Sequence, residues 1–198
     1  MSNDSLINMV GRGLCREWCP EKGEVWSTIW TLSERDYITR IFELHKEEEI
    51  RNLPMLDKVG KLQIPIMTQK RFDFLETSEE FPLQDIINKF GVDYFTNSFA
   101  YMLSYALYIG NVNQIDLYGV PFANNTEYMF QRPCTEFWIG VAMGLGVKVN
   151  IWGLSELLRA TKKVLYGYGV EQKNIPMQMD TGIINTIFDG KQSALWGK

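Results

Sequence analysis

The chain has 198 residues and a mass of 23.0 kDa, which suits one domain and argues against two full ones. It is 45% hydrophobic and 22% charged, a composition that supports a buried core and excludes a disordered chain. Its formal net charge of −4 argues against a large surface for the phosphates of duplex DNA. We therefore expect one globular domain that does not bind nucleic acid.

Cysteine content and hydropathy indicate the compartment. Cys15, Cys19 and Cys134 are too few and too unevenly spaced for a disulfide framework. The N-terminus carries no basic targeting region, and the longest mostly apolar run, residues 98–109, is too short to span a bilayer. We expect a cytoplasmic protein in a reducing compartment, without a membrane partner.

The first half of the chain predicts short strands separated by turns. Residues 6–10 (LINMV) form an apolar run that stops at a glycine turn, and residues 24–32 (EVWSTIWTL) and 39–44 (TRIFEL) are rich in β-branched and aromatic residues. Residues 45–58 have helical apolar spacing interrupted by Pro54. Residues 62–67 (LQIPIM) predict a strand whose proline places it at a sheet edge or a strand start.

The second half alternates helices and strands. Residues 83–90 predict a short helix closed by Gly91, and residues 98–109 predict an apolar helix that ends at Gly110. Strands are predicted at residues 114–119 and 147–152, with a helix between them at 133–145 that has its proline near the first turn. Short connections between alternating elements are typical of β-α-β crossovers in a parallel sheet.

The predicted fold class is therefore α/β, a single three-layer Rossmann-like domain with a mostly parallel sheet and a short C-terminal appendage. We assign residues 1–168 to this domain and residues 169–198 to a tail with one short helix. The periodicity weakens in that tail, and we expect it to be the element that forms a homo-oligomer.

Ligands of an open parallel sheet collect beyond the carboxyl ends of its strands. Gly11, Arg12 and Gly13 directly follow the first predicted strand. Glycines there let the backbone approach a phosphate, and a guanidinium pairs with one. A tight strand-to-helix turn requires the same glycines, so the motif indicates either a ligand cradle or a plain turn.

Thr96, Asn97 and Ser98 stand at the start of the apolar helix. Unsatisfied N–H groups and the positive end of the helix dipole favour an anion at such a position. The same three side chains also suit ordinary N-capping. We expect this helix start to face the same sheet edge as the glycine turn.

Glu43 and His45 alternate at the end of a predicted strand, so both side chains should point to one face. His45 is the only histidine of the chain, and a neighbouring carboxylate would orient it as a general acid or base. The alternative is a structural histidine that caps the following helix. No metal site is predicted, because the other acids have no ligand spacing, and the residues indicate no particular cofactor.

Residues 124–132 (NNTEYMFQR) follow the strand at 114–119 at the same expected edge. Glu127, Tyr128, Gln131 and Arg132 have the side chains to stack on a base and to hydrogen-bond its edge, and Arg132 suits a diphosphate. The alternative is a loop anchored by its aromatic residues.

The sequence resembles a group of Rossmann-like proteins encoded by bacteriophages and prophages. The matching features are NMVGRG, IFELHK, a TNS helix start before a long apolar helix, IDLYGV and EYMFQRPCTEFWIGVAMGLGVKV, which together span about residues 5 to 168. The group is distantly similar to motility-accessory-factor glycosyltransferase-like domains and to bacterial sialyltransferases. The resemblance implies that residues 1–168 are a Rossmann-like nucleotide-binding domain in which Gly11, Gly13, Asn97 and Ser98 contact a nucleotide.

Two functional hypotheses follow, which share one pocket. In the first, a phage-type nucleotide-binding protein transfers a sugar or a related group from a nucleotide donor, with Glu43 and His45 as the catalytic pair. In the second, a non-catalytic protein sequesters a nucleotide-derived signal in the host cytoplasm and so blunts host defence. A phage accessory protein without an active pocket is the third option.

Overall fold

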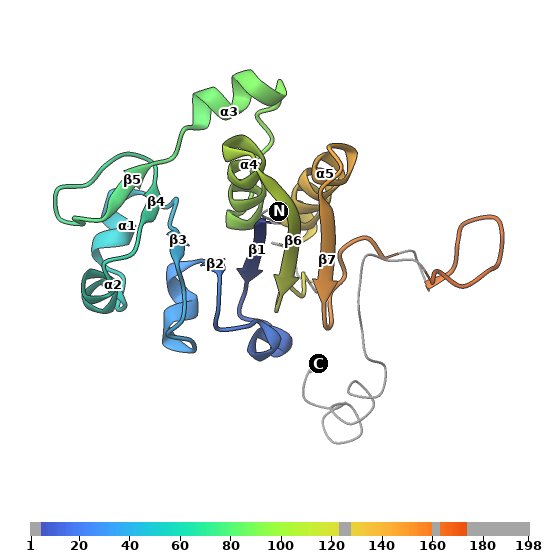
Figure 1. Ribbon diagram of the computed structural model, residues 1–198, viewed down its shortest axis with the longest axis horizontal. Helices are drawn as coiled ribbons and strands as arrows, with labels where there is room; N and C mark the ends of the chain where they lie inside the picture. The colour runs from blue at the N-terminus through green and yellow to red at the C-terminus, as the bar shows by residue number, and fades with distance from the viewer. Residues whose placement is uncertain (1–4, 123–127, 160–162, 174–198) are drawn as a thin grey trace.

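The computed structural model describes residues 5–122, 128–159 and 163–173. Their strands form one parallel sheet of seven strands in the order β5-β4-β3-β2-β1-β6-β7, which Figure 1 shows from left to right. The strands are β1 (Ser5–Val10), β2 (Glu24–Ser27), β3 (Arg40–Phe42), β4 (Ile66–Thr68), β5 (Ser78–Glu80), β6 (Val112–Tyr118) and β7 (Lys148–Trp152). The fold is therefore α/β and Rossmann-like.

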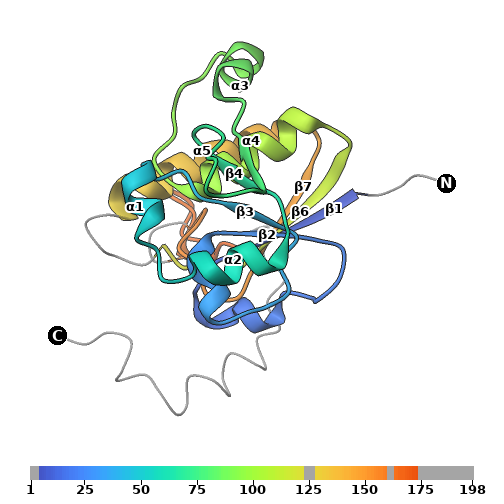
Figure 2. The same ribbon diagram turned by 90° about the vertical axis from the view of Figure 1, so that its left-hand side faces the viewer.

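Helices cover both faces of this sheet. In Figure 2 α3, α4 and α5 lie above the sheet and α2 lies below it. The α-helices are α1 (Glu47–Arg51), α2 (Leu56–Leu62), α3 (Leu83–Phe90), α4 (Ser98–Ile109) and α5 (Tyr128–Gly144), and two short 3₁₀ helices are η1 (Leu14–Trp18) and η2 (Ile29–Ser33). Three layers result, with the sheet in the middle.

The face under α4 and α5 holds the main apolar core. Alternation along the strands sends Ile7 and Met9 of β1, and Ile115 and Leu117 of β6, into this core. Aromatic side chains of the sheet and the helices meet there: the ring of Trp26 on β2 lies 5.7 Å from that of Tyr105 on α4. α4 contributes Ala100, Met102, Leu103, Ala106 and Leu107, which explains why its sequence is apolar on nearly every side.

The opposite face is built differently. A separate apolar cluster joins η2, α1 and α2 to β3 and β4 through residues such as Ile29, Ile50 and Ile66. From β1 to the β7 edge of the sheet this face carries a polar row: Asn8, Asp116 and Asn150 occupy registered positions on β1, β6 and β7. All three residues are buried. We call them the polar row.

The predicted elements are largely confirmed, with corrections in the first half. The strand expected at residues 24–32 ends at Ser27, and η2 follows, because Ile29 and Leu32 are spaced to pack on the same side of a helical turn. The proline of residues 62–67 immediately precedes β4, so it marks a strand start. One edge of the sheet is formed by β5, which the sequence analysis did not predict, and the other by β7.

The second half follows the predictions closely. α3 spans the predicted residues 83–90, and its C-cap Gly91 has the positive φ of 69° that favours glycine. α5 begins at Tyr128, five residues before the predicted start, which places Pro133 beyond the first turn. Helix-favouring Met and Gln residues and tertiary contacts from α4, described below, extend this helix toward its N-terminus.

Most of the assigned tail, residues 174–198, lies outside the described residues. The described chain ends with an antiparallel bridge between Val164 and Glu171, which spans the boundary drawn at residue 168. Among the helices of the described chain, none has the length and apolar character needed to cross a membrane.

Candidate functional site

The strand order reverses between β1 and β6. The chain builds β1 to β5 in one direction and then returns to place β6 on the other side of β1. In open parallel sheets this reversal separates neighbouring loops, and ligands bind at the carboxyl ends of the two strands. A cavity of about 280 Å³ lies at that point, and we call it the switch-point pocket. Its lining residues are Gly11, Arg12, Gly13, Thr28, Phe99, Gly119, Val120, Pro121, Phe122 and Tyr128.

The glycine turn forms one wall of this pocket. The N–H of Gly11 donates to the carbonyl of Tyr118 (2.8 Å), and the N–H of Gly13 donates to the carbonyl of Gly119 (2.8 Å). A Cβ atom added to Gly11 would lie 2.5 Å from the Gly119 carbonyl oxygen, and one added to Gly13 would lie 2.8 Å from it. The close crossing of the β1 and β6 loops therefore accounts for both glycines, and their N–H groups are used within the protein.

Aromatic side chains form the apolar part of the pocket. The rings of Phe99 and Phe122 meet edge to face at 6.3 Å, and those of Phe122 and Tyr128 at 5.5 Å. Phe122 has a φ of 42°, in the left-handed region that bulky side chains rarely occupy. Such backbone strain clusters at functional sites. Phe99, in the first turn of α4, brings the helix start to the same rim as the glycine turn.

The three polar residues at that helix start have structural partners. The amide oxygen of Asn97 accepts from the N–H of Ala100 (3.1 Å), which is an N-cap. Its amide nitrogen donates to the carbonyl of Gln131 (2.8 Å), and the hydroxyl of Thr96 donates to the carbonyl of Phe130 (3.1 Å). These bonds join the N-termini of α4 and α5. Ser98 is the first residue of α4, and the pocket lining includes none of the three.

The structure places only some of the site residues predicted at 124–132 at the pocket. Glu127 lies outside the described residues, whereas Tyr128 lines the pocket. Arg132 donates from Nε to Oε1 of Glu136 (2.8 Å) within α5. Gln131 uses its carbonyl to accept from Asn97. Of the described residues in this group, only Tyr128 faces the switch-point pocket.

Glu43 and His45 contact each other, as their alternation predicts. Nδ1 of His45 lies against Oε1 of Glu43. The Glu43 side chain is 2% exposed and that of His45 is 57% exposed. They follow β3, which is separated from β1 by β2, so the pair lies at the carboxyl edge of the sheet but does not line the switch-point pocket.

The cysteines are free and buried. Burial raises the pKa of Cys19 to about 11, and it also raises the pKa of Cys15. Thiols in such surroundings stay protonated and unreactive at neutral pH. Among the described residues, no group of His, Cys, Asp and Glu side chains is arranged to hold a metal ion.

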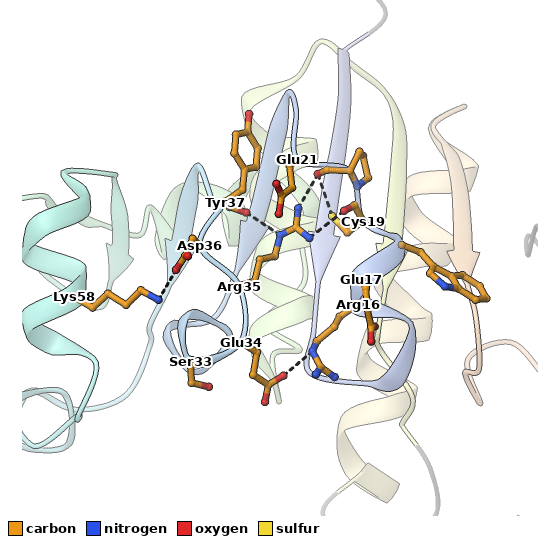
Figure 3. Close-up of a pocket in the computed structure, with 12 residues that line it drawn as sticks. Arg16, Glu17, Cys19, Glu21, Ser33, Glu34, Arg35, Asp36, Tyr37 and Lys58 are labelled. Atoms are coloured by element: carbon orange, nitrogen blue, oxygen red, sulfur yellow. Dashed lines mark hydrogen bonds and ion pairs between the residues drawn. The ribbon is translucent and has the colours of Figure 1, made fainter. Parts of the chain in front are cut away.

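Sequence reasoning missed a second, wider cavity of about 1120 Å³, which Figure 3 shows between η1 and the segment that follows η2. We call it the η1–η2 groove. The Arg35 guanidinium donates to the carbonyls of Cys19, Pro20 and Tyr37, and Lys58 pairs with Asp36 (2.6 Å). Its cations are thus engaged within the protein. We favour the smaller pocket as the site, because it lies at the strand reversal.

The comparisons with known proteins do not extend this description. No protein-family model, no curated protein and no solved structure matches the chain. The functional argument therefore depends on the geometry of the switch-point pocket.

Proposed function

We propose that this protein binds a nucleotide or a nucleotide-derived small molecule in the switch-point pocket, and that it acts as a non-catalytic binder. The observation that carries the proposal is the combination of Phe99, Phe122 and Tyr128 with the Arg12 side chain around one cavity at the strand reversal. Aromatic rings stack on a base, and a guanidinium pairs with a phosphate.

The size of the pocket limits what it encloses. Its volume of about 280 Å³ is just below the range of small-molecule sites, which span roughly 300–1,000 Å³. A base with its ribose suits that space better than a complete nucleotide sugar. The phosphates would then project past Arg12, whose side chain is 54% exposed.

The chemistry of the lining favours binding over catalysis. Arg12, Thr28 and Tyr128 supply the polar side chains of the described pocket wall. None of these is a carboxylate, imidazole or thiol that would serve as an ordinary acid, base or nucleophile at neutral pH. The sequence resemblance implies nucleotide contacts in a phage-type protein, and capture of a nucleotide-derived signal requires only such a pocket.

Ligand-induced stabilisation tests this proposal. The four common nucleosides, their 5′-monophosphates and a set of nucleotide sugars are added to the protein, and the melting temperature is measured. A ligand that binds the native state raises it by mass action. Phe99→Leu should weaken the affinity about tenfold, because a lost stacking contact is worth about 1–3 kcal/mol. Phe137→Leu, a substitution of an exposed ring on α5, is the matched control and should bind normally.

Absence of any shift with every compound at millimolar concentration would contradict the nucleotide proposal. A shift that Phe99→Leu and Phe137→Leu retain equally would place the ligand elsewhere on the protein.

A second candidate function, group transfer from a nucleotide donor, is supported by the contact between Glu43 and His45. Under this hypothesis the protein releases product from a nucleotide sugar, and His45→Ala loses turnover but keeps its affinity for the donor. Under the binder proposal the wild-type protein stabilises with the same compound and releases no product. Chromatography of the incubated donor separates the two outcomes.

A further inference from the structure

A single carboxylate joins two arginines at the mouth of the switch-point pocket. Nε and Nη2 of Arg12 donate to Oε1 of Glu34 at 3.3 and 3.1 Å. Nε of Arg16 lies 2.7 Å from Oε2 of the same side chain. Two guanidinium groups thus share one carboxylate, and the cluster keeps a net positive charge.

This cluster lies between the two cavities described above. Arg12 lines the switch-point pocket, whereas Arg16 and Glu34 line the η1–η2 groove, where Figure 3 shows their contact. The Cβ atom of Arg16 also lies close to the pocket wall, because a Cβ atom added to Gly119 would be 3.0 Å from it. The shared carboxylate therefore places the Arg16 guanidinium next to that of Arg12, at one side of the pocket.

Arg16 is held in place by bonds to the backbone as well as by Glu34. Nη1 of Arg16 donates to the carbonyls of Arg12 and Gly13, both at 3.3 Å, which ties it to the glycine turn. The backbone of Glu34 is fixed by its N–H bond to Thr31 (3.0 Å), but its side chain can rotate away without any change of the chain path. The Arg12 side chain is 54% exposed, and an ion pair made by such an exposed group is weak and easily exchanged.

We propose that Arg12 and Arg16 form a phosphate-binding subsite of the switch-point pocket, which Glu34 fills as an internal anion in the protein alone. A phosphate carries more charge than a carboxylate and offers more acceptor oxygens to the two guanidinium forks. It therefore displaces Glu34, whose side chain swings toward the groove. This inference rests on the proposed function for the base and ribose, and it assigns the second anchor of the same ligand.

Titration with inorganic pyrophosphate tests the subsite without any base. Calorimetry at low ionic strength measures its affinity for the wild-type protein, Glu34→Gln and Arg12→Gln. Glu34→Gln should bind pyrophosphate about fivefold more tightly, because the competing charge is removed. Arg12→Gln should bind it about tenfold more weakly, and higher salt should weaken wild-type binding.

Glu47→Gln is the matched control, since Glu47 also bridges two cations, Arg51 and Lys70, at a distance from the pocket. It should leave pyrophosphate affinity unchanged. Equal affinities in the wild-type protein, Glu34→Gln and Arg12→Gln would overturn the subsite, as would an equal gain in Glu47→Gln.

Nucleosides distinguish this failure from a failure of the proposed function. If uridine or another nucleoside stabilises the protein while its 5′-monophosphate binds no more tightly, the pocket stands and the phosphate subsite is wrong. If pyrophosphate binds through Arg12 while no nucleoside or nucleotide binds, the anion subsite is supported and the nucleotide proposal is wrong.

Discussion

The two faces of the sheet are held together by different interactions. Under α4 and α5 a continuous apolar core contains stacked and edge-to-face rings, such as Phe95 on Trp138 at 5.2 Å. The other face has shorter helices, the polar row and the η1–η2 groove. The difference indicates that the α4–α5 face supplies most of the stability. The face with the short helices supplies the directional contacts that position charged groups near the pocket.

The largest expected effect that tests this comparison is in the α4–α5 core. Trp138 is fully buried between Phe90 and Phe95, and its indole N–H donates to the carbonyl of Tyr94 (2.9 Å). Trp138→Ala should lower the free energy of unfolding by about 3–5 kcal/mol, measured by urea denaturation. Trp30→Ala, on η2 and 39% exposed, should cost less than about 1 kcal/mol. Equal losses would contradict the proposed division of stability.

A smaller loss is expected from the polar row. Oδ1 of Asp116 accepts from Asn150 (2.7 Å) and from Gln114 (2.9 Å). Asp116→Ala leaves those amide donors without their acceptor, which should cost about 1–3 kcal/mol of unfolding free energy. The same substitution at the exposed Asp93 should change it by less than about 0.5 kcal/mol. If Asp116→Ala were neutral, the row would contribute little to the stability of this face.

The smallest expected effect is a dependence of the free energy of unfolding on alkaline pH. Burial raises the pKa of Cys19 from its ordinary 9.0 to about 11, and it also raises the pKa of Tyr118. The unfolded thiol ionises first, so the unfolded state binds fewer protons above pH 9. The free energy of unfolding should therefore be highest below pH 9 and should fall as the pH rises toward 11. Denaturation across that range should show a shallower fall for Cys19→Ala, and identical slopes would rule out this contribution.

The sequence predicted the elements whose periodicity is strong. The bounds of α3 and α4 follow from their apolar spacing and from Gly91 and Gly110, because these helices pack against one continuous core. β5 was missed because its residues, Ser78–Glu80, show no apolar alternation and two of them are exposed glutamates at the sheet edge. Charged residues are common on edge strands, where they discourage pairing with other chains.

The candidate site was predicted only in part. Placement of the glycine turn at a strand end follows from sequence order, and so does the contact of Glu43 with His45. A second signal was available in Gly119, which directly follows β6 as Gly11 follows β1. Two such glycines after paired strands indicate a close crossing of the two loops. The Glu34 bridge joins residues far apart in the chain, and no local pattern reveals it.

The pairing of β1 with β6 also determines when the pocket can form. β1 begins at Ser5, but its partner begins only at Val112, and the aromatic wall is completed by Phe122 and Tyr128. During synthesis the glycine turn of the pocket therefore leaves the ribosome long before the aromatic residues of the pocket. Until β6 emerges, one edge of β1 lacks its native neighbour and is open to strands of other nascent chains. Only a chain that has completed this late pairing step contains the whole pocket.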